Sequence, residues 1–207
     1  MVREGILWAL VPLVAALGLT FLGYWPAALP FYALALFMAY FFRDPNRLVP
    51  TDASLVVSPA DGRVTRVERL RPDDKDSPKV VSIFLSPFDV HINRAPIAGE
   101  VTDVTYTKGR FMIATRDDAS LVNEQNALTI RGEEATVVCK QIAGVVARRI
   151  VCWKKPGDRV ERGERIGLIK FSSRTDLVLP PEVELEVKVG DRVRGGVSLI
   201  GRVRDGR

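Results

Sequence analysis

Two long apolar runs at the N-terminus constrain the fold of this chain more than any other feature. Residues 6–22 and 26–42 contain no charged side chain, and Gly23, Tyr24 and Trp25 separate them. Each run has about 17 residues, which is the short limit for a helix that crosses the hydrocarbon core of a bilayer. The pattern predicts a membrane helical hairpin, spanning or re-entrant. The alternative is a buried helical hairpin of a soluble protein.

Basic residues stand at both outer ends of this pair of runs. Arg3 precedes the first run, and Arg43 and Arg47 follow the second. Segments rich in Lys and Arg stay on the cytoplasmic side of a membrane. We therefore expect the rest of the chain at the cytoplasmic face of the cell (inner) membrane. A cleaved signal peptide is disfavoured, because a second apolar run follows at once.

The composition changes sharply after the second run. We therefore divide the chain into a membrane-associated helical hairpin, residues 1–43, and a β-rich catalytic domain, residues 44–207. Short alternating apolar runs, such as those at 64–67, 80–85 and 183–189, are bounded by Gly, Pro and Asp. This pattern predicts a mostly antiparallel β domain.

Two short sequences recur within the β-rich part. Ser58-Pro59-Ala60-Asp61-Gly62 is similar to Ala95-Pro96-Ile97-Ala98-Gly99, and Gly-Asp-Arg-Val occurs at 157–160 and again at 190–193. Their glycines permit positive φ at tight turns. Together the repeats resemble the half-motifs of biotinyl/lipoyl-type barrel-sandwich hybrids, in which such hairpins interlock into a flattened β sandwich. This resemblance concerns the fold, and a fold does not give a function.

The composition excludes several classes of site. The 207 residues include one histidine, His91, and two cysteines, Cys139 and Cys152, and the net charge is +5. One histidine and no cluster with ligand spacing predict no metal site. The cysteines lie in apolar surroundings and read as reduced core residues. The basic residues are not interleaved with aromatic ones, so we expect no nucleic-acid partner.

Two polar stretches beside strand-like runs are candidates for chemistry. Asp89 and His91 follow the run at 80–85, and side chains two apart in an extended segment point to the same side. A carboxylate placed there can orient an imidazole, which can deprotonate a hydroxyl. Ser172 and Ser173 interrupt the strand-like stretch 165–180. The alternatives are a structural histidine and a turn rich in Ser, Thr and Asp.

Several motifs, taken together and in order, resemble those of the phosphatidylserine decarboxylases, most of all the short form of that family. They follow the membrane-like N-terminus and are Phe42-Arg43-Asp44-Pro45, Ser58-Pro59-Ala60-Asp61-Gly62, Phe84-Leu85-Ser86-Pro87-Phe88-Asp89-Val90-His91 and Phe171-Ser172-Ser173-Arg174. The resemblance covers nearly the whole chain. It implies a proenzyme that cuts itself autocatalytically and converts a serine into an N-terminal pyruvoyl group, which is a covalent cofactor.

Carried onto this chain, the resemblance makes Ser173 the pyruvoyl precursor. The bond to break is Ser172–Ser173, which gives a β-chain to residue 172 and an α-chain from 173. His91, held by Asp89, is implied as the base for the Ser173 hydroxyl and as a proton donor in the decarboxylation. The family has Gly where this chain has Ser172. An uncleaved, inactive proenzyme is therefore one expected state of this chain.

The implied reaction is decarboxylation of phosphatidylserine, or of an archaetidylserine-like analogue, to phosphatidylethanolamine and carbon dioxide. Its partners are the lipid bilayer and the phospholipid substrate. Weaker candidates for substrate contact, with ion pairs or turns as their structural alternatives, are Arg174, Arg94, Phe111, Asn126 and Asp61. A homodimer is a further expectation, because β domains of this size often pair their edges.

A different class of function is a non-catalytic, membrane-anchored barrel-sandwich protein. A carrier of this class has a lysine flanked by small or Met residues at a hairpin tip, and an adaptor has a long heptad hairpin between its half-motifs. The sequence shows neither feature. The decarboxylase is therefore the favoured interpretation.

Overall fold

The computed structural model describes residues 1–112, 122–144, 149–171 and 173–204, so Ser172 lies outside the described residues. The chain forms two compact units, Met1–Asn46 and Arg47–Arg207, which we describe separately. The elements are α1 Arg3–Phe21, α2 Trp25–Phe41, β1 Leu55–Val57, β2 Gly62–Arg69, β3 Lys79–Leu85, β4 Ile92–Arg94, β5 Gly99–Thr107, β6 Gln125–Arg131, β7 Thr136–Ala143, β8 Ile150–Cys152, β9 Arg159–Val160, β10 Arg165–Ile169, β11 Ser173–Leu179, β12 Val183–Leu185, β13 Arg192–Val193 and β14 Leu199–Val203.

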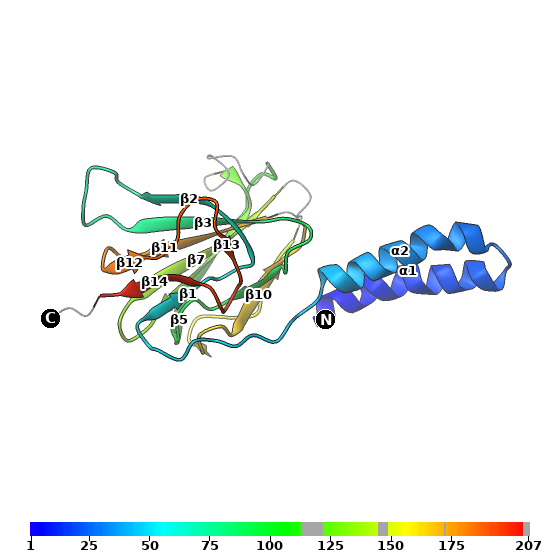
Figure 1. The fold of residues 1–207 in the computed structure, drawn as a ribbon, viewed down its shortest axis with the longest axis horizontal. Coiled ribbons are helices and arrows are strands. Elements are labelled where there is room, and N and C mark those ends of the chain that lie inside the picture. Colours follow the sequence, from blue (N-terminus) through cyan, green and yellow to red (C-terminus); the bar gives the residue numbers. More distant parts are fainter. Residues whose placement is uncertain (113–121, 145–148, 172, 205–207) are drawn as a thin grey trace. The chain divides into compact units, whose positions relative to one another are not determined.

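The first unit is a hairpin of the two helices α1 and α2 (Figure 1), and small residues are among those that the helices bury. Ala16 of α1 and Ala28 of α2 are fully buried. Gly5 lies against Phe42, where an added Cβ would stand 2.3 Å from the Phe42 Cβ. Small residues let two helix backbones approach closely, which is how helices associate in lipid.

The outer surface of the hairpin is apolar and exposed. Leu7 is 69% exposed, Val11 66% and Leu36 73%. By length and composition α1 is long and apolar enough to cross a membrane, with Arg3 and Glu4 confined to its first turn, whereas α2 has no charged residue but only 17 residues. A buried hairpin of a soluble protein would hide these side chains, so the exposed surface indicates membrane association.

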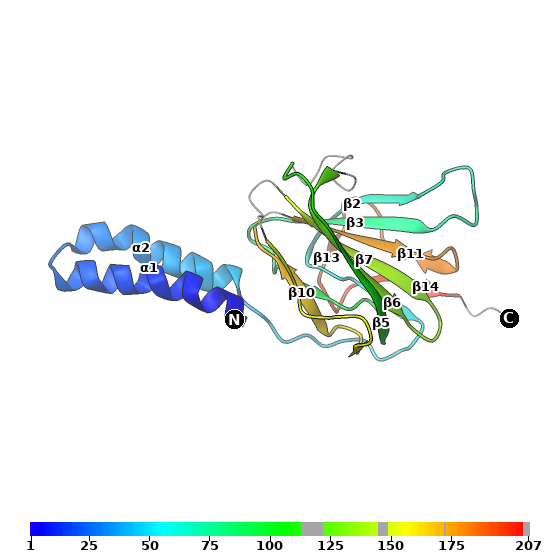
Figure 2. The ribbon, with the colours of Figure 1, turned by 180° about the vertical axis from the view of Figure 1, so that it is seen from behind.

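The second unit is mostly antiparallel β structure, as predicted. One sheet has eight strands in the order β13-β2-β3-β11-β7-β6-β5-β9, and two further sheets have the orders β4-β10-β8 and β1-β14-β12. Figures 1 and 2 show β3, β11 and β7 side by side from both directions. Alternate residues of the large sheet, including Ile83, Leu128 and Leu177, form the buried core. Together with the helical hairpin, this architecture confirms the expected fold class.

The sequence repeats correspond to a structural duplication. The Gly-Asp-Arg-Val copy that contains β13 pairs with β2, and the copy that contains β9 pairs with β5. The backbone bonds repeat as well, since Val64 N donates to the Asp191 carbonyl at 2.9 Å and Val101 N donates to the Asp158 carbonyl at 2.8 Å. Each copy of one repeat therefore pairs with one copy of the other.

Glycine is required three residues after each Gly-Asp-Arg-Val copy. Gly163 and Gly196 both have a φ of +75°, a left-handed backbone conformation that residues with a side chain rarely adopt. The backbone N–H of Gly163 donates to the Ala95 carbonyl at 2.8 Å. In the same way, the N–H of Gly196 donates to the Ser58 carbonyl at 2.8 Å. These bonds join distant parts of the chain, so the turns help to hold the β domain together.

The cysteine thiols differ in their burial, and this leads to a prediction. Cys139 is fully buried in the core, and Cys152 is half-buried against it. Burial raises the pKa of the Cys139 thiol to about 12. At pH 8 about one Cys139 thiol in ten thousand is then ionised, and the thiolate is the reactive form. We expect a soluble alkylating reagent to leave Cys139 unmodified until urea unfolds the domain, as measured by peptide mass. Native labelling of Cys139 as fast as that of Cys152 would contradict this.

The expected homodimer depends on strand edges, and the edges of the large sheet are short. Both edge strands, β9 and β13, have two residues and begin with an arginine. Short and charged edges are a known protection against edge-to-edge pairing. The homodimer stays a prediction, and light scattering of the protein in detergent tests it. A monomer mass would rule the dimer out.

Candidate active site

Ser173 begins the central strand of the large sheet. In β11 it pairs with Leu85 of β3 on one side and with Ala143 of β7 on the other. Its side chain is fully buried, and its Oγ has no hydrogen-bond partner among the described residues. A buried hydroxyl without a partner is unfavourable in a folded protein and calls for an explanation. A reaction at this oxygen is one such explanation.

Two connections bring His91 to the end of the domain where Ser173 lies. The chain leaves β3 at Leu85, the neighbour of Ser173, and reaches His91 after a turn. The His91 carbonyl also accepts a hydrogen bond from the backbone N–H of Ile169 at 3.2 Å. Ile169 ends β10, and the next strand along the chain is β11. Sequence-distant residues thus meet at one end of the β domain.

The imidazole of His91 is buried and its orientation is set by a backbone group. Its exposed fraction is 2%, and its Nδ1 lies 3.0 Å from the carbonyl oxygen of Asp89. Because a carbonyl only accepts hydrogen bonds, Nδ1 must carry the hydrogen. The Nε2 atom is then the basic nitrogen of the ring, as a general base requires.

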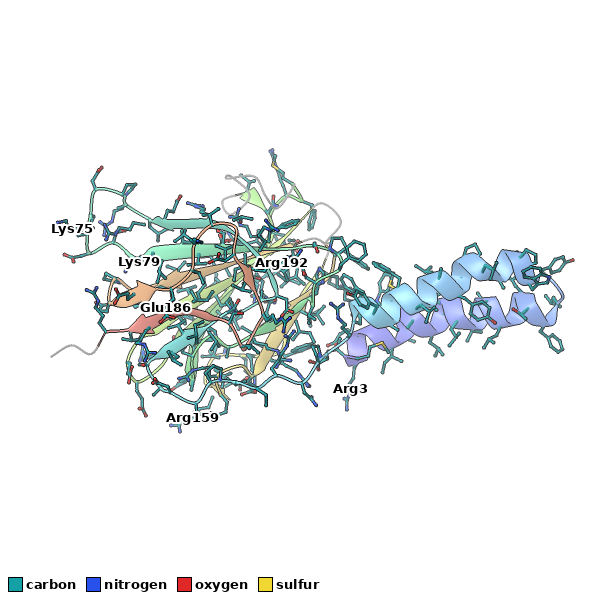
Figure 3. All side chains as sticks on the ribbon, in the orientation of Figure 1. Arg3, Lys75, Lys79, Arg159, Glu186 and Arg192 are labelled. Carbon is teal, nitrogen blue, oxygen red and sulfur yellow. The ribbon has the colours of Figure 1, made fainter. Side chains whose placement is uncertain are left out.

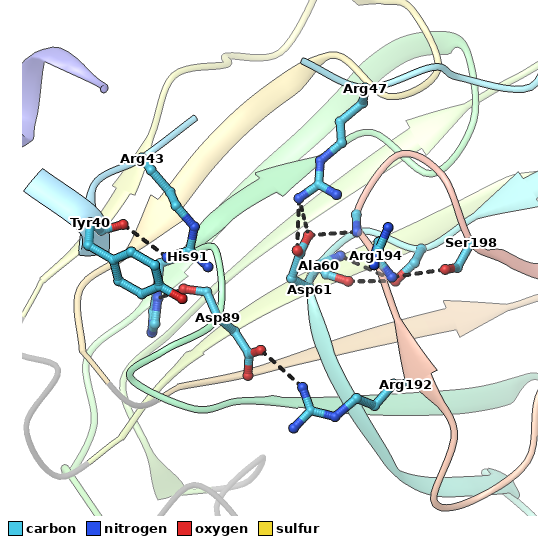
Figure 4. Close-up of polar contacts among 12 residues, drawn as sticks. Tyr40, Arg43, Arg47, Ala60, Asp61, Asp89, His91, Arg192, Arg194 and Ser198 are labelled. Carbon is cyan, nitrogen blue, oxygen red and sulfur yellow. Dashed lines mark hydrogen bonds and ion pairs between the residues drawn. The ribbon is translucent and has the colours of Figure 1, made fainter. Parts of the chain in front are cut away.

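The printed contacts of the Asp89 carboxylate are with Ser86 and Arg192, and its catalytic role stays a prediction. Its Oδ2 accepts hydrogen bonds from the Ser86 backbone N–H at 2.8 Å and from the Ser86 hydroxyl at 2.7 Å, and its Oδ1 lies 3.7 Å from Nη1 of Arg192 (Figure 4). The prediction assumed an extended backbone. Residues 86–91 form a turn between β3 and β4 instead, so the carboxylate holds the turn while the carbonyl of Asp89 holds the histidine.

The backbone is strained just before Ser173. Phe171 has a φ of 58°, and among the described residues it is the one non-glycine residue with a positive value. This conformation is a genuine outlier for a bulky side chain. A residue held in this way costs on the order of 1–3 kcal/mol, and such strain often marks functional sites.

Two arginines expected to contact substrate are buried in structural contacts. Arg174 alternates with Ser173 along β11, so its side chain lies on the opposite face of the sheet. Its Nε lies 2.8 Å from Oδ1 of Asp176, and its Nη2 donates to Oδ2 at 3.0 Å. Nη1 of Arg94 donates to the Gly163 carbonyl at 2.9 Å. The surface ion pair considered for Arg174 is therefore a buried one.

The Asp61 carboxylate is also bonded to other parts of the β domain. Its Oδ2 accepts a hydrogen bond from Nη2 of Arg47 at 2.8 Å, and its Oδ1 accepts one from the Gly195 backbone N–H at 2.8 Å (Figure 4). Ala98 occupies the matching position of the repeat. The Asp61 carboxylate therefore links the first repeat to Arg47 and to Gly195. The second repeat has no such carboxylate. Substrate contact by Asp61 stays a prediction.

The remaining weak candidates differ in burial. Phe111 is 36% exposed, whereas Asn126 is 3% exposed and its Nδ2 donates to Oε1 of Gln141 at 3.0 Å. That bond leads to residues that the sequence analysis missed, namely Gln141, Asn93 and Thr175. The signal was a polar residue at an inward position of each apolar strand, which is visible only once the register is known.

One cavity of the β domain lies away from these residues. Its volume is about 510 Å³, and its lining includes Lys75, Lys79 and Arg204. Lys79 begins β3, whereas Ser173 pairs with Leu85 at the other end of that strand. Figure 3 shows Lys75 and Lys79 at the end of the β domain away from Arg192. Within the described residues no group of three or more His, Cys, Asp or Glu side chains could hold a metal ion.

The fold and these buried polar residues define a β protein with an N-terminal apolar helical hairpin and a buried candidate site. Comparisons with known proteins identify its family. A profile of the phosphatidylserine decarboxylase family matches residues 34–201. The phosphatidylserine decarboxylase proenzyme of Solibacter usitatus is 48% identical over 204 residues, which cover 99% of this chain and 97% of that protein. That of Nitrosomonas eutropha is 42% identical over 204 residues, with 98% and 94% covered. The chain belongs to the phosphatidylserine decarboxylase family and is therefore a decarboxylase.

Proposed function

We propose that this chain decarboxylates phosphatidylserine, or an analogue with other tails, after making its own pyruvoyl group from Ser173. The observation that carries the proposal is the fully buried Ser173 Oγ, which has no hydrogen-bond partner among the described residues. It lies at the strand end to which the fold brings His91. A buried, unpaired serine at the start of a strand fits a residue that becomes a new N-terminus there.

The processing step needs a base and an attackable carbonyl. His91 Nε2 takes the proton of the Ser173 hydroxyl, and Ser173 Oγ bonds to the carbonyl carbon of residue 172. Collapse of this tetrahedral species breaks the C–N bond and returns the proton to the nitrogen, which leaves an ester. Elimination of that ester releases the upstream chain, and hydrolysis with loss of ammonia leaves the pyruvoyl group.

The chemistry that such a group supplies is an electron sink for the carbon that loses carbon dioxide. The residues of this chain do the rest. His91, 2% exposed, can return a proton to that carbon. The burial of Ser173 and His91 keeps bulk water away, which strengthens electrostatic interactions at the site.

Ser172 is the departure from the family pattern that bears on processing. A serine has a more restricted φ than a glycine and crowds the attacked carbonyl. Its neighbour Phe171 already has a positive φ, which is strained for a bulky residue. We therefore propose that Ser172 slows the cut and that the chain remains an inactive proenzyme until it is processed.

The exposed apolar hairpin supports a membrane location, where a phospholipid substrate resides. Arg3, Arg43 and Arg47 flank the two helices on their outer ends. Following the positive-inside rule, we propose that both ends of the hairpin, and hence the β domain, face the cytoplasm.

The test is the intact mass of the purified protein beside its Ser172→Gly variant. A large fragment ending at residue 172 and a small fragment with a blocked N-terminus support self-cleavage and the pyruvoyl group. A cut confined to Ser172→Gly identifies Ser172 as the block. If neither protein is cut, the pyruvoyl mechanism fails, and the non-catalytic adaptor becomes the better interpretation.

A further inference from the structure

A row of paired residues runs across the large sheet close to Ser173. Every strand of that sheet except β9 contributes one residue to the row. In order from β13 to β5, these residues are Arg192, Arg63, Phe84, Arg174, Ile142, Gln125 and Thr107. Ser173 lies one residue beyond the row, and the chain that leads from β3 to His91 also leaves beyond it. We call the part of the β domain at and beyond this row the site end.

The exposed aromatic side chains of the β domain gather at the site end. Among the described residues of this domain they are Phe88, Tyr106 and Phe111. Phe88 is 66% exposed and lies in the turn that leads to His91. Tyr106 is next to the row in β5, and Phe111 follows that strand. Aromatic residues are enriched where a protein meets the interface between membrane and water.

The exposed charges of the site end have one sign. Within the described part of the chain, its exposed charged side chains are all basic, and they include Arg63, Lys108, Arg110 and Arg192. The acidic side chains there are only half-buried ones, namely Asp61, Asp89 and Glu124. A surface of this kind attracts the anionic headgroups of a bilayer, and the attraction falls off within about 10 Å of the surface.

The opposite end of the β domain carries exposed charges of both signs. The connection between β2 and β3 contains Lys75 beside Asp76, and the connection between β6 and β7 contains Glu133 beside Glu134. Figure 3 shows Lys75 at the end away from Arg192. The bias towards exposed basic and aromatic residues therefore belongs to the site end and not to the surface as a whole.

We propose that the site end is a docking surface for an anionic lipid bilayer and that Phe88 inserts among the lipids. Insertion removes the exposed ring of Phe88 from water, while the basic side chains meet lipid phosphates. Arginine suits this contact because its guanidinium can donate two parallel hydrogen bonds to one phosphate. The inference rests on the proposed membrane location, and it does not depend on the pyruvoyl chemistry.

Docking in this way brings the lipid headgroups to the candidate base. Phe88 directly precedes Asp89, whose carbonyl oxygen lies 3.0 Å from Nδ1 of His91. The Asp89 carboxylate lies 3.7 Å from Nη1 of Arg192, so the turn and the basic surface adjoin. An apolar hairpin tethers the domain to a membrane without fixing which of its ends meets the lipids. The site end supplies that orientation, and a phospholipid then presents its headgroup beside the turn without leaving the bilayer.

The experiment places the environment-sensitive fluorophore nitrobenzoxadiazole at position 88 of the full chain. The label is attached to Phe88→Cys in a Cys152→Ser background, where the fully buried Cys139 stays unlabelled. In vesicles of phosphatidylcholine with phosphatidylglycerol, we expect blue-shifted emission and quenching by a nitroxide-bearing lipid. The same label on Lys75→Cys is the matched control, and we expect it to report water in every vesicle.

A pair of charge variants, made with the label kept at position 88, tests the basic surface. Arg63→Gln with Lys108→Gln removes two exposed cations from the site end, and Lys75→Gln with Arg131→Gln removes two from the opposite end. Each basic residue near an anionic membrane surface changes the partition by about fivefold. We expect the first variant to lower the ratio of docked to undocked domains by about 25-fold, and the second to leave it unchanged. The ratio is measured as the phosphatidylglycerol content of the vesicles is raised.

Flotation of the vesicles separates this inference from the proposed membrane location. If the chain floats with the vesicles while the label at position 88 reports water, the docking inference is wrong and the membrane location stands. A blue shift without quenching by the nitroxide lipid would place residue 88 against protein, such as a second copy of the chain, and would also overturn the inference. Equal effects of the two charge variants would contradict a role for the site end. If the chain floats with no vesicle, both proposals fail.

Discussion

The variant His91→Ala, made in the Ser172→Gly protein, is expected to remain a single uncut chain without decarboxylase activity. His91 is the only histidine of the chain. Its Nδ1 is bonded to the Asp89 carbonyl, which makes Nε2 the basic atom of the ring. Loss of a general base slows proton transfer by about 10²–10⁴-fold, and a slow acyl shift leaves nothing to eliminate. Intact mass after a fixed incubation measures the cut fraction.

Asp89→Asn is the informative contrast to this variant. The backbone carbonyl at position 89 orients the imidazole, and a side-chain substitution keeps that carbonyl. An asparagine oxygen can still accept from the Ser86 backbone N–H. We expect Asp89→Asn to cut far faster than His91→Ala. Equal loss in both variants would show that the carboxylate is needed after all, and cleavage in His91→Ala would remove the histidine from processing.

Asp176→Ala is expected to have the largest effect on stability. Asp176 and Arg174 are each 2% exposed and are joined by two contacts of 2.8 and 3.0 Å. Removing one partner of a buried ion pair typically costs 3–5 kcal/mol, because the other charge remains in a medium that solvates it poorly. Such a loss is a large part of the stability of a domain, which is about 5–15 kcal/mol. Urea unfolding followed by circular dichroism measures the difference.

The double variant Arg174→Met with Asp176→Leu separates the ion pair from the packing around it. Replacing both charges by apolar residues of similar volume is often neutral or stabilising. We expect the double variant to recover most of the stability that Asp176→Ala loses. A double variant as unstable as the single one would mean that Arg174 is needed for another contact. Retained cleavage in the Ser172→Gly background would also show that Arg174 is not required for processing.

The fold was readable from local patterns to a large extent. Runs of apolar residues without charge predicted both helices to within a few residues, because length and composition alone decide whether a segment suits a bilayer. The repeated Gly-Asp-Arg-Val units marked the turns that the duplication uses. Strand order was beyond this reasoning, because the partners of β11 lie far away in sequence at β3 and β7.

The sequence predicted residues of the candidate site only where they belong to a recognised motif. Ser173 and His91 came from motifs, and the structure places both at the end of β3. The contact between Asp89 and His91 was predicted for an extended backbone, but residues 86–91 form a turn. Arg174 was a candidate for substrate contact, but strand alternation turns it to the face opposite Ser173, where it pairs with Asp176.

The sequence by itself determined the class of this protein: an apolar hairpin, a duplicated β domain and the motifs of a decarboxylase family. Only the tertiary structure decided which polar groups meet. The chain from Asn126 through Gln141 and Asn93 to Thr175 joins four different strands, β6, β7, β4 and β11. Its members are inward residues of apolar strands, and nothing local distinguishes them from isolated polar substitutions. Hydrogen bonds between side chains depend on register and on which strands face each other, and long-range packing sets both.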